Sequence, residues 1–123
     1  MKKLLIILLF VPVFAFGRTA ERVMTGVEVL RQGGFECLKG KRVGLITNPT
    51  GVDSNLKSTV DILFEAEEVN LVALYGPEHG VRGDVVAGEK VNDQIDAKTG
   101  LKVYSLYGKT RKPTAEMLAG VDV

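Results

Sequence analysis

The chain alternates between short apolar runs and polar segments that contain glycine or proline. Two of the runs, Arg42 to Asn48 and Val69 to Tyr75, predict buried strands, and the first is rich in β-branched residues. Between them, apolar residues recur at helical spacing: Leu56, Val60, Leu63 and Phe64. Asp53 or Ser54 is placed to cap the helix that this spacing predicts. A strand, a helix and a strand within this length form a βαβ unit, which implies parallel strands and a right-handed crossover.

Further elements are predicted on both sides of this unit. A short helix is expected around Val27 to Arg31, and a third strand near Lys102 to Leu106. Residues 112–120 predict another short helix, with Pro113 in its first turn and Gly120 just past its end. The final three residues look like the start of a further strand. The pattern predicts the α/β class: a Rossmann-like parallel sheet with flanking helices, incomplete at the C-terminus.

Composition narrows the classes of function. The chain has 123 residues, enough for one modest domain, and a formal charge of +1. Acidic and basic residues are nearly balanced, so no strong field attracts nucleic acid or a charged membrane. One cysteine and one histidine make a poor metal set, and the glycine motif of dinucleotide sites does not occur, so we expect no metal and no cofactor. Cys37 cannot form an internal disulfide and is expected to be a small buried residue.

The first residues, MKKLLIILLFVPVFAFG, have the pattern of a secretory signal peptide. Lys2 and Lys3 form a positive start, and the apolar run from Leu4 to Phe16 is too short to span a bilayer comfortably. Small residues at the end of the segment predict cleavage after Gly17, so that the mature chain begins at Arg18. We therefore expect a secreted or periplasmic protein with no stable membrane insertion after cleavage.

Three predicted loops follow the predicted strands: residues 48–53, 76–88 and 107–111. Ligands of open parallel sheets bind beyond the carboxyl ends of the strands, so the polar groups of these loops are expected to converge on one edge. The middle loop carries GPEHGVRGD, which includes the only histidine of the chain. Its glycines admit unusual backbone dihedrals and the close approach of a ligand.

The middle loop supplies most of the candidate site residues. Glu78 could act as an acid or a base if partial burial raised its pKa. His79 would orient Glu78 or contact a substrate, and Arg82 would hold an anion with two parallel hydrogen bonds. Asn48 is expected at the same edge. The alternative interpretation is a solvated turn whose charges have no function, because loop residues are often polar without a specific role.

Several motifs in this order resemble a known bacterial family: GLITNPTGVD, LYGPEHGVRGD, AGEKV, TGLKVYSLYG and KPTAEMLAGVDV. From about Thr25 to Val123, the chain is similar to the N-terminal portion of the family catalogued as domain of unknown function 1343, now associated with NamZ-type exo-β-N-acetylmuramidases. The resemblance implies a peptidoglycan-recycling enzyme that removes N-acetylmuramic acid from the non-reducing ends of wall fragments. It also implies that residues 18–123 form the N-terminal part of a Rossmann-like catalytic domain, with a second domain closing the cleft.

The resemblance suggests roles for the loop residues. Glycoside hydrolysis usually needs two carboxyl groups, and Glu78 is the candidate for the general acid. Glu89 is a candidate for the second group, a later segment of the protein is another, and the acetamido oxygen of the substrate is a third. Asn48 would orient the sugar or its amide, and Arg82 would pair with the lactyl carboxylate of muramic acid.

The sequence departs from the family pattern because it ends where members of the family continue. We therefore expect a fragment that is weakly active by itself. The sequence is also compatible with two other functions. One is a non-catalytic module that binds cell-wall glycans, although such modules often present aromatic platforms and this chain has no tryptophan. The other is an inactive truncated remnant without a ligand.

Overall fold

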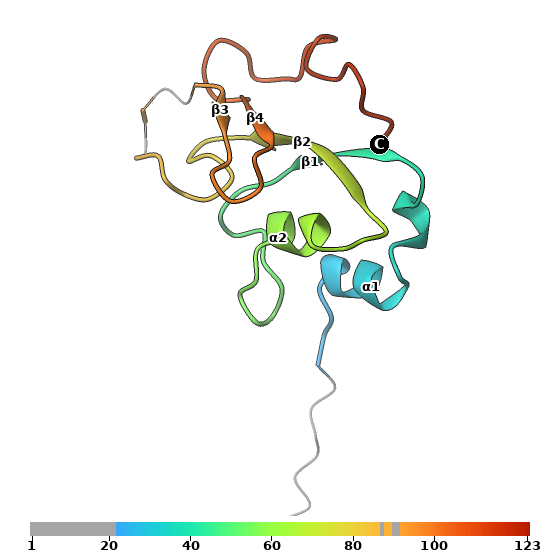
Figure 1. Ribbon diagram of the computed structural model, residues 1–123. Coiled ribbons are helices and arrows are strands. Elements are labelled where there is room, and N and C mark those ends of the chain that lie inside the picture. Colours follow the sequence, from blue (N-terminus) through green and yellow to red (C-terminus); the bar gives the residue numbers. More distant parts are fainter. Residues whose placement is uncertain (1–21, 87, 90–91) are drawn as a thin grey trace, which may run out of the picture.

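The computed structural model describes residues 22–86, 88–89 and 92–123 (Figure 1). Its elements, in chain order, are α1 (Gly26–Gln32), the 3₁₀ helix η1 (Glu36–Leu38), β1 (Arg42–Ile46), α2 (Thr59–Phe64), β2 (Asn70–Gly76), β3 (Gln94–Ile95) and β4 (Lys102–Ser105). The predicted signal peptide lies outside the described residues. None of the helices within the described residues has both the length and the apolar character needed to cross a membrane.

The four strands form one sheet in the order β1-β2-β4-β3. β1, β2 and β4 run parallel, whereas β3 is antiparallel to β4. Ile46 pairs with Tyr75, and Tyr75 pairs with Tyr104, so the three parallel strands reach their carboxyl ends at the same edge. The parallel strands and the helix between the first two confirm the predicted α/β class. The architecture is that of an incomplete Rossmann-like domain.

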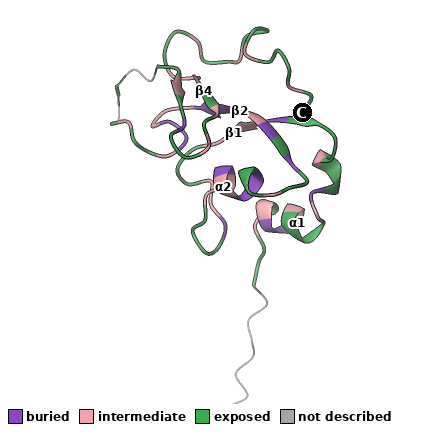
Figure 2. Cartoon of the chain, in the orientation of Figure 1, coloured by how far each residue is buried: buried purple, intermediate pink, exposed green. Residues whose placement is uncertain are grey.

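One face of the sheet carries the hydrophobic core. Side chains from three strands meet side chains of α2 and the turn before β1 there; the most buried include Phe35, Val43, Val60, Leu63, Leu71, Leu74 and Val103. α1 adds Val27 and Leu30 to the same cluster. Both helices therefore lie on one side of the sheet, and the buried positions gather between them and the strands (Figures 1 and 2). The core fixes the sheet from which the site loops emerge.

The opposite face of the sheet is covered by the segment that follows β4. The rings of Tyr75 and Tyr104 stack on this face, with centroids 5.4 Å apart. The Tyr75 hydroxyl donates a hydrogen bond to the Met117 carbonyl oxygen (2.7 Å). Gly44 leaves room for this arrangement, because a Cβ there would lie 2.9 Å from the Tyr75 ring and 3.0 Å from Val121. Burial raises the pKa of Tyr75, and the neighbouring Tyr104 adds to this effect.

The second helix begins later than predicted. α2 starts at Thr59, and Ser58 is its N-cap, because the Ser58 side chain accepts a hydrogen bond from the Val60 backbone N–H (3.2 Å). Asp53 caps a turn instead, since its Oδ1 accepts from the backbone N–H groups of Asn55 and Lys57 (2.9 Å each). Leu56 belongs to this turn, with a φ of 62° and an exposed side chain. An aspartate that bonds to nearby backbone groups competes with helix formation.

The helix predicted at residues 112–120 is replaced by a series of turns. Leu118 N–H does donate to the Thr114 carbonyl (3.1 Å), but Ala119 N–H bonds to Glu116 and the pattern does not repeat. The Met117 carbonyl is held by the Tyr75 hydroxyl of the sheet. A short helix gains little from its own hydrogen bonds, so this tertiary contact outweighs the local preference.

Two other expectations concern single segments. Cys37 was expected to be buried but is exposed, because the η1 turn directs Phe35 and Leu38 toward the core instead. The last three residues were expected to begin a strand; they form no assigned strand but run along the free edge of β1. Asp122 N–H donates to the Arg42 carbonyl and Gly44 N–H donates to the Val123 carbonyl (2.8 Å each). The Asp122 carboxylate also binds the Arg42 guanidinium.

Candidate functional site

The loops after the parallel strands leave the sheet together. Backbone pairing continues past the strand ends, since Thr47 N–H donates to Tyr75 (3.2 Å) and Leu106 N–H donates to Gly76 (2.8 Å). The first two loops touch each other, because a Cβ at Gly83 would lie only 2.9 Å from Cγ of Pro49. The structure thus brings residues 48–53 and 76–88 into contact at the edge where ligands of such sheets bind.

A tight backbone turn presents Glu78 and His79. His79 has a φ of 71° and Gly80 a φ of 72°, so two successive residues adopt the left-handed conformation. That conformation is uncommon for a residue other than glycine and costs on the order of 1 kcal/mol or more. Gly80 N–H donates to the Pro77 carbonyl (3.0 Å), and a Cβ at Gly76 would lie 3.2 Å from the Gly80 Cα. The loop therefore folds back tightly on the end of β2.

The two candidate catalytic side chains are half-buried. Nδ1 of His79 lies 3.3 Å from the Val85 carbonyl oxygen. A carbonyl only accepts, so this contact is a hydrogen bond when Nδ1 carries the proton, and Nε2 then keeps its lone pair. Within the described residues, Glu78 forms no ion pair with a lysine or arginine. The nearby Arg82 binds two other carboxylates, those of Asp61 and Asp96.

Arg82 points to two carboxylates outside its own loop. Nε donates to Oδ1 of Asp96, and Nη2 donates to Oδ2 of Asp96 (3.0 Å) and to Oδ1 of Asp61 (2.9 Å). Asp61 belongs to α2, and Asp96 follows β3. The expectation that Arg82 binds the lactyl carboxylate of a substrate has no support in this geometry, since the guanidinium already binds two carboxylates of this chain.

The charges of this cluster stabilise one another. The Arg82 hydrogen bonds hold the pKa of Asp96 at about 2, below its usual value, and bonds from Thr99 contribute. Burial raises the pKa of Asp61, but hydrogen bonds from Lys98 and Arg82 outweigh that effect and lower it overall. The two carboxylates in turn raise the pKa of Arg82. All of these groups are ionised at neutral pH.

The other two candidate residues, Asn48 and Glu89, form local hydrogen bonds. Asn48 is exposed, and its Oδ1 accepts hydrogen bonds from the Thr50 N–H (3.2 Å) and hydroxyl (2.9 Å), which closes a turn in the first loop. Glu89 is exposed, and its N–H donates to the Val86 carbonyl (3.2 Å). Neither hydrogen-bonds to Glu78 or His79 within the described part of the chain. Their assignment to substrate binding stays a prediction.

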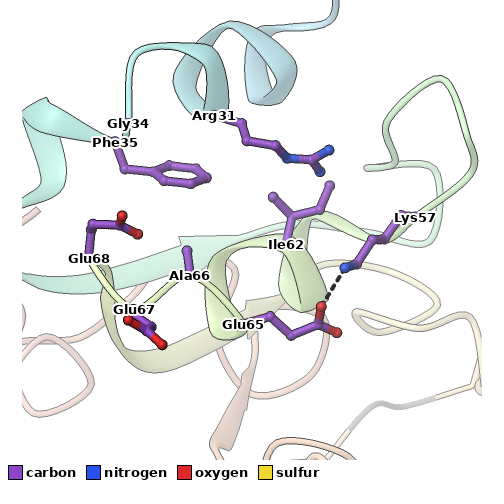
Figure 3. A pocket seen from close by; sticks show the side chains of 9 residues that line it. All are labelled: Arg31, Gly34, Phe35, Lys57, Ile62, Glu65, Ala66, Glu67 and Glu68. Atoms are coloured by element: carbon purple, nitrogen blue, oxygen red, sulfur yellow. Dashed lines mark hydrogen bonds and ion pairs between the residues drawn. The ribbon is translucent and has the colours of Figure 1, made fainter.

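Three cavities border the sheet among the described residues. One, of about 350 Å³, lies at the carboxyl end of β4 and is lined by Asn92, Asp93, Ser105, Lys109, Thr110 and Met117. A larger one, of about 430 Å³, lies between α1 and α2 (Figure 3). Phe35, Glu67 and Glu68 line the larger cavity and precede β1 or β2 in the chain, so much of its wall comes from the amino ends of these strands. A third cavity, of about 270 Å³, lies beside the middle candidate loop and is lined by Val81, Arg82 and Asp84 of that loop together with residues 94–98.

Sequence reasoning assigned no role to Asp61 or Asp96. The run DAKTG from Asp96 to Gly100 carries a usable signal, because an aspartate followed by threonine and glycine is typical of a turn closed by the aspartate side chain. The structure has such a turn, in which Asp96 Oδ2 accepts from the N–H and the hydroxyl of Thr99 (2.9 and 2.7 Å). No pattern in the sequence links that turn to Arg82.

Comparisons with known proteins agree on one family. Residues 43–123 match the family model described as "Exo-beta-N-acetylmuramidase NamZ, N-terminal". A curated relative, peptidoglycan beta-N-acetylmuramidase NamZ of Bacillus subtilis (strain 168), is 60% identical over 102 residues, which cover 83% of this chain and 25% of the relative.

Two crystal structures of DUF1343 family proteins from Bacteroides fragilis NCTC 9343 have a similar fold. One is 69% identical, with a TM-score of 0.72 over 80% of this chain and 24% of the other. The second is 35% identical, with a TM-score of 0.60 over 80% of this chain and 23% of the other. The chain thus spans about a quarter of the length of the relatives it matches.

Proposed function

Since this chain belongs to the NamZ family of exo-β-N-acetylmuramidases, to whose N-terminal portion it corresponds, we propose that it contributes the acid-bearing loop of a glycoside hydrolase. The proposed reaction releases N-acetylmuramic acid from the non-reducing ends of peptidoglycan fragments. The observation that carries this proposal is the strained turn at His79 and Gly80, which holds Glu78 at the ligand-binding edge of the sheet.

Glu78 is assigned the role of general acid. It protonates the glycosidic oxygen while the bond from that oxygen to the anomeric carbon breaks and positive charge develops on the sugar ring. Its side chain is half-buried and forms no ion pair with a lysine or arginine among the described residues. His79, with Nδ1 directed to Val85, offers Nε2 as an acceptor for a sugar hydroxyl.

The second half of the reaction needs a group that stabilises the ring or activates water. Glu89 follows Glu78 on the same connection and is one candidate. The acetamido oxygen of the substrate is another, since an N-acetyl sugar can act as its own nucleophile. Asn48 would then orient that amide. A Glu89→Gln variant separates these candidates, because substrate assistance does not depend on Glu89.

The rival function, a binding module without catalysis, has weaker support. Glycan-binding modules commonly stack sugars on exposed aromatic rings. Tyr75 is 2% exposed and lies beneath the segment after β4, so it offers no such surface. The guanidinium carbon of Arg111 lies over the Tyr107 ring, 6.0 Å from the ring centroid. These contacts indicate that the tyrosines stabilise the fold and do not form an aromatic surface on which a sugar could stack.

The function is testable in a hybrid protein, in which this chain replaces the matching quarter of the Bacillus subtilis relative. The hybrid should release N-acetylmuramic acid from wall fragments that carry it at the non-reducing end. Glu78→Gln should lower turnover by about 10²–10⁴-fold while substrate binding persists. An active hybrid that keeps its full rate with glutamine at this position would exclude Glu78 as the acid.

We also propose that the protein is exported, on the basis of the positively charged start and apolar run of its first residues. Export would place the loop on the side of the membrane where peptidoglycan lies. N-terminal sequencing of the protein recovered outside the cytoplasm should begin at Arg18. A product that retains the apolar run from Leu4 to Phe16 would contradict cleavage.

A further inference from the structure

The Arg82 guanidinium joins three parts of the fold: its own loop, α2 through Asp61, and the turn after β3 through Asp96. We propose that Arg82 is a positioning residue that fixes the Glu78 carboxyl group for proton transfer and makes no contact with the substrate. The inference rests on the proposed function, since it assigns Arg82 an effect on the reaction through Glu78.

The chain between Glu78 and Arg82 is short and anchored, so the position of one determines that of the other. Val81, which lies between them, is 2% exposed and belongs to the hydrophobic core. Gly80 packs on Gly76 at the end of β2. Three residues separate Glu78 from Arg82. Two of them are fixed, Gly80 by its contact with the end of β2 and Val81 by the core. If Arg82 lost its hydrogen bonds to Asp61 and Asp96, the C-terminal side of this turn would no longer be fixed.

The partner of Arg82 is itself rigid. The Asp96 side chain is 4% exposed and accepts two further hydrogen bonds from Thr99. The Asp96 backbone is fixed as well, because its N–H donates to Leu101 (2.9 Å) and its carbonyl accepts from Gly100 (2.8 Å). Two parallel hydrogen bonds between a planar guanidinium and a carboxylate define an orientation as well as a distance. Arg82 therefore fixes the loop against a stable reference point.

The charge balance of the cluster also favours positioning over ligand binding. Lys98 Nζ lies 2.7 Å from Oδ2 of Asp61, so two cations face two carboxylates. The Arg82 side chain is 28% exposed, and each of its bonds to a carboxylate would have to be given up to hold a substrate anion. Removal of such bonds from a buried carboxylate is costly. The cluster has no excess positive charge to attract the lactyl group.

The test compares two substrates that differ in their need for a proton. Hydrolysis of the disaccharide N-acetylmuramyl-N-acetylglucosamine requires protonation of the leaving oxygen, whereas a 4-nitrophenyl N-acetylmuramide needs little. In the hybrid protein, Arg82→Gln combined with Asp96→Asn removes both charges and leaves no unpaired carboxylate at Asp96. We expect kcat on the disaccharide to fall by about 10–100-fold, as for a misplaced catalytic group, with a much smaller loss on the nitrophenyl substrate. KM should change little.

Two variants control for effects on the fold. Arg42→Gln breaks another arginine–carboxylate pair, with Asp122, at the opposite end of β1, and any loss there should be equal on both substrates. Arg82→Lys keeps the charge without the planar fork, and it should restore part of the disaccharide rate. Rates are expressed per folded protein, measured by circular dichroism.

The outcomes are distinct. Equal losses on the two substrates, or no loss at all, would overturn the positioning role and leave Arg82 with a part in stability alone. A muramic-acid-specific loss, absent with the matching glucosamine substrates, would overturn it in favour of direct binding. Should Glu78→Gln itself prove harmless, the proposed acid fails, and that result is separate from the behaviour of Arg82.

Discussion

Arg82 and Asp96 meet through two hydrogen bonds, one from Nε and one from Nη2, at a carboxylate that is almost fully buried. This pair makes the stability of the fold depend on pH. The pKa of Asp96 is about 2 in the folded protein, below its ordinary value of 3.8, so the folded state binds its proton less tightly. The contribution to stability, about 2 kcal/mol, is fully present above pH 3.8 and is lost as the pH falls toward 2.

Acid unfolding therefore tests the pair. In thermal melts of the hybrid protein from pH 5 to pH 2.5, the native sequence should lose more stability than Asp96→Asn, which has no carboxylate to protonate at this position. The two melting temperatures should converge at the acid end of the range. Parallel curves for the two proteins would show that Asp96 does not carry the acid sensitivity.

Gly80 is predicted to tolerate no side chain. Its φ is 72°, and a Cβ there would lie 3.1 Å from Oδ1 of Asp84. Gly80→Ala should cost about 1 kcal/mol of stability from the backbone alone and should also reduce turnover, because the turn that carries Glu78 must shift. Gly88→Ala is the matched control, since its φ is 81° and an added Cβ there would have no neighbouring atom within 4 Å among the described residues. Equal rates in the two variants would argue against a role for the turn in catalysis.

The Tyr75 hydroxyl is predicted to hold the segment after β4. Tyr75→Phe removes the hydrogen bond to Met117 and leaves that carbonyl without its partner, at a cost of about 1 kcal/mol. Amide hydrogen exchange should become faster in residues 112–120 and change little in β1. Tyr104→Phe is the control, because the Tyr104 hydroxyl forms no hydrogen bond within the described residues. If exchange in both variants matched that of the parent, the contact would be dispensable.

Cys37 is predicted to react with thiol reagents in the folded protein. The side chain is exposed in η1, and the turn directs its neighbours Phe35 and Leu38 inward. The tryptic peptide QGGFECLK should be alkylated in native buffer at nearly the rate seen in denaturant. Strong protection under native conditions would indicate that this surface is covered in the intact protein.

The strands were predictable because apolar runs bounded by turn residues need little tertiary information. β1 and β2 lie where the pattern placed them, within one or two residues. The starts and ends of helices were less predictable. Asp53 has the residue type of a helix cap, but its carboxylate bonds to backbone groups of a turn, and Ser58 caps α2 instead. Both choices are compatible with the local sequence, and the packing of Val60 and Leu63 decides between them.

The candidate site was predictable only in part. Parallel strands put loops at one edge, so the contact between Pro49 and Gly83 follows from the fold class. The partners of Arg82 are 21 and 14 residues away in the chain, and nothing in the local pattern identifies them. A lone arginine near a glutamate and a histidine resembles a ligand-binding group. Its actual environment depends on how α2 and the turn after β3 pack.

β3 has a consequence for the behaviour of the protein in solution. It is two residues long, runs against its neighbour, and forms one outer margin of the sheet. A long, flat edge strand would present a row of unpaired backbone N–H and C=O groups to a second molecule. An edge strand of two residues presents few such groups, so a second molecule has little backbone with which to pair. This side of the sheet is thus protected against intermolecular strand addition, the first step of fibre formation.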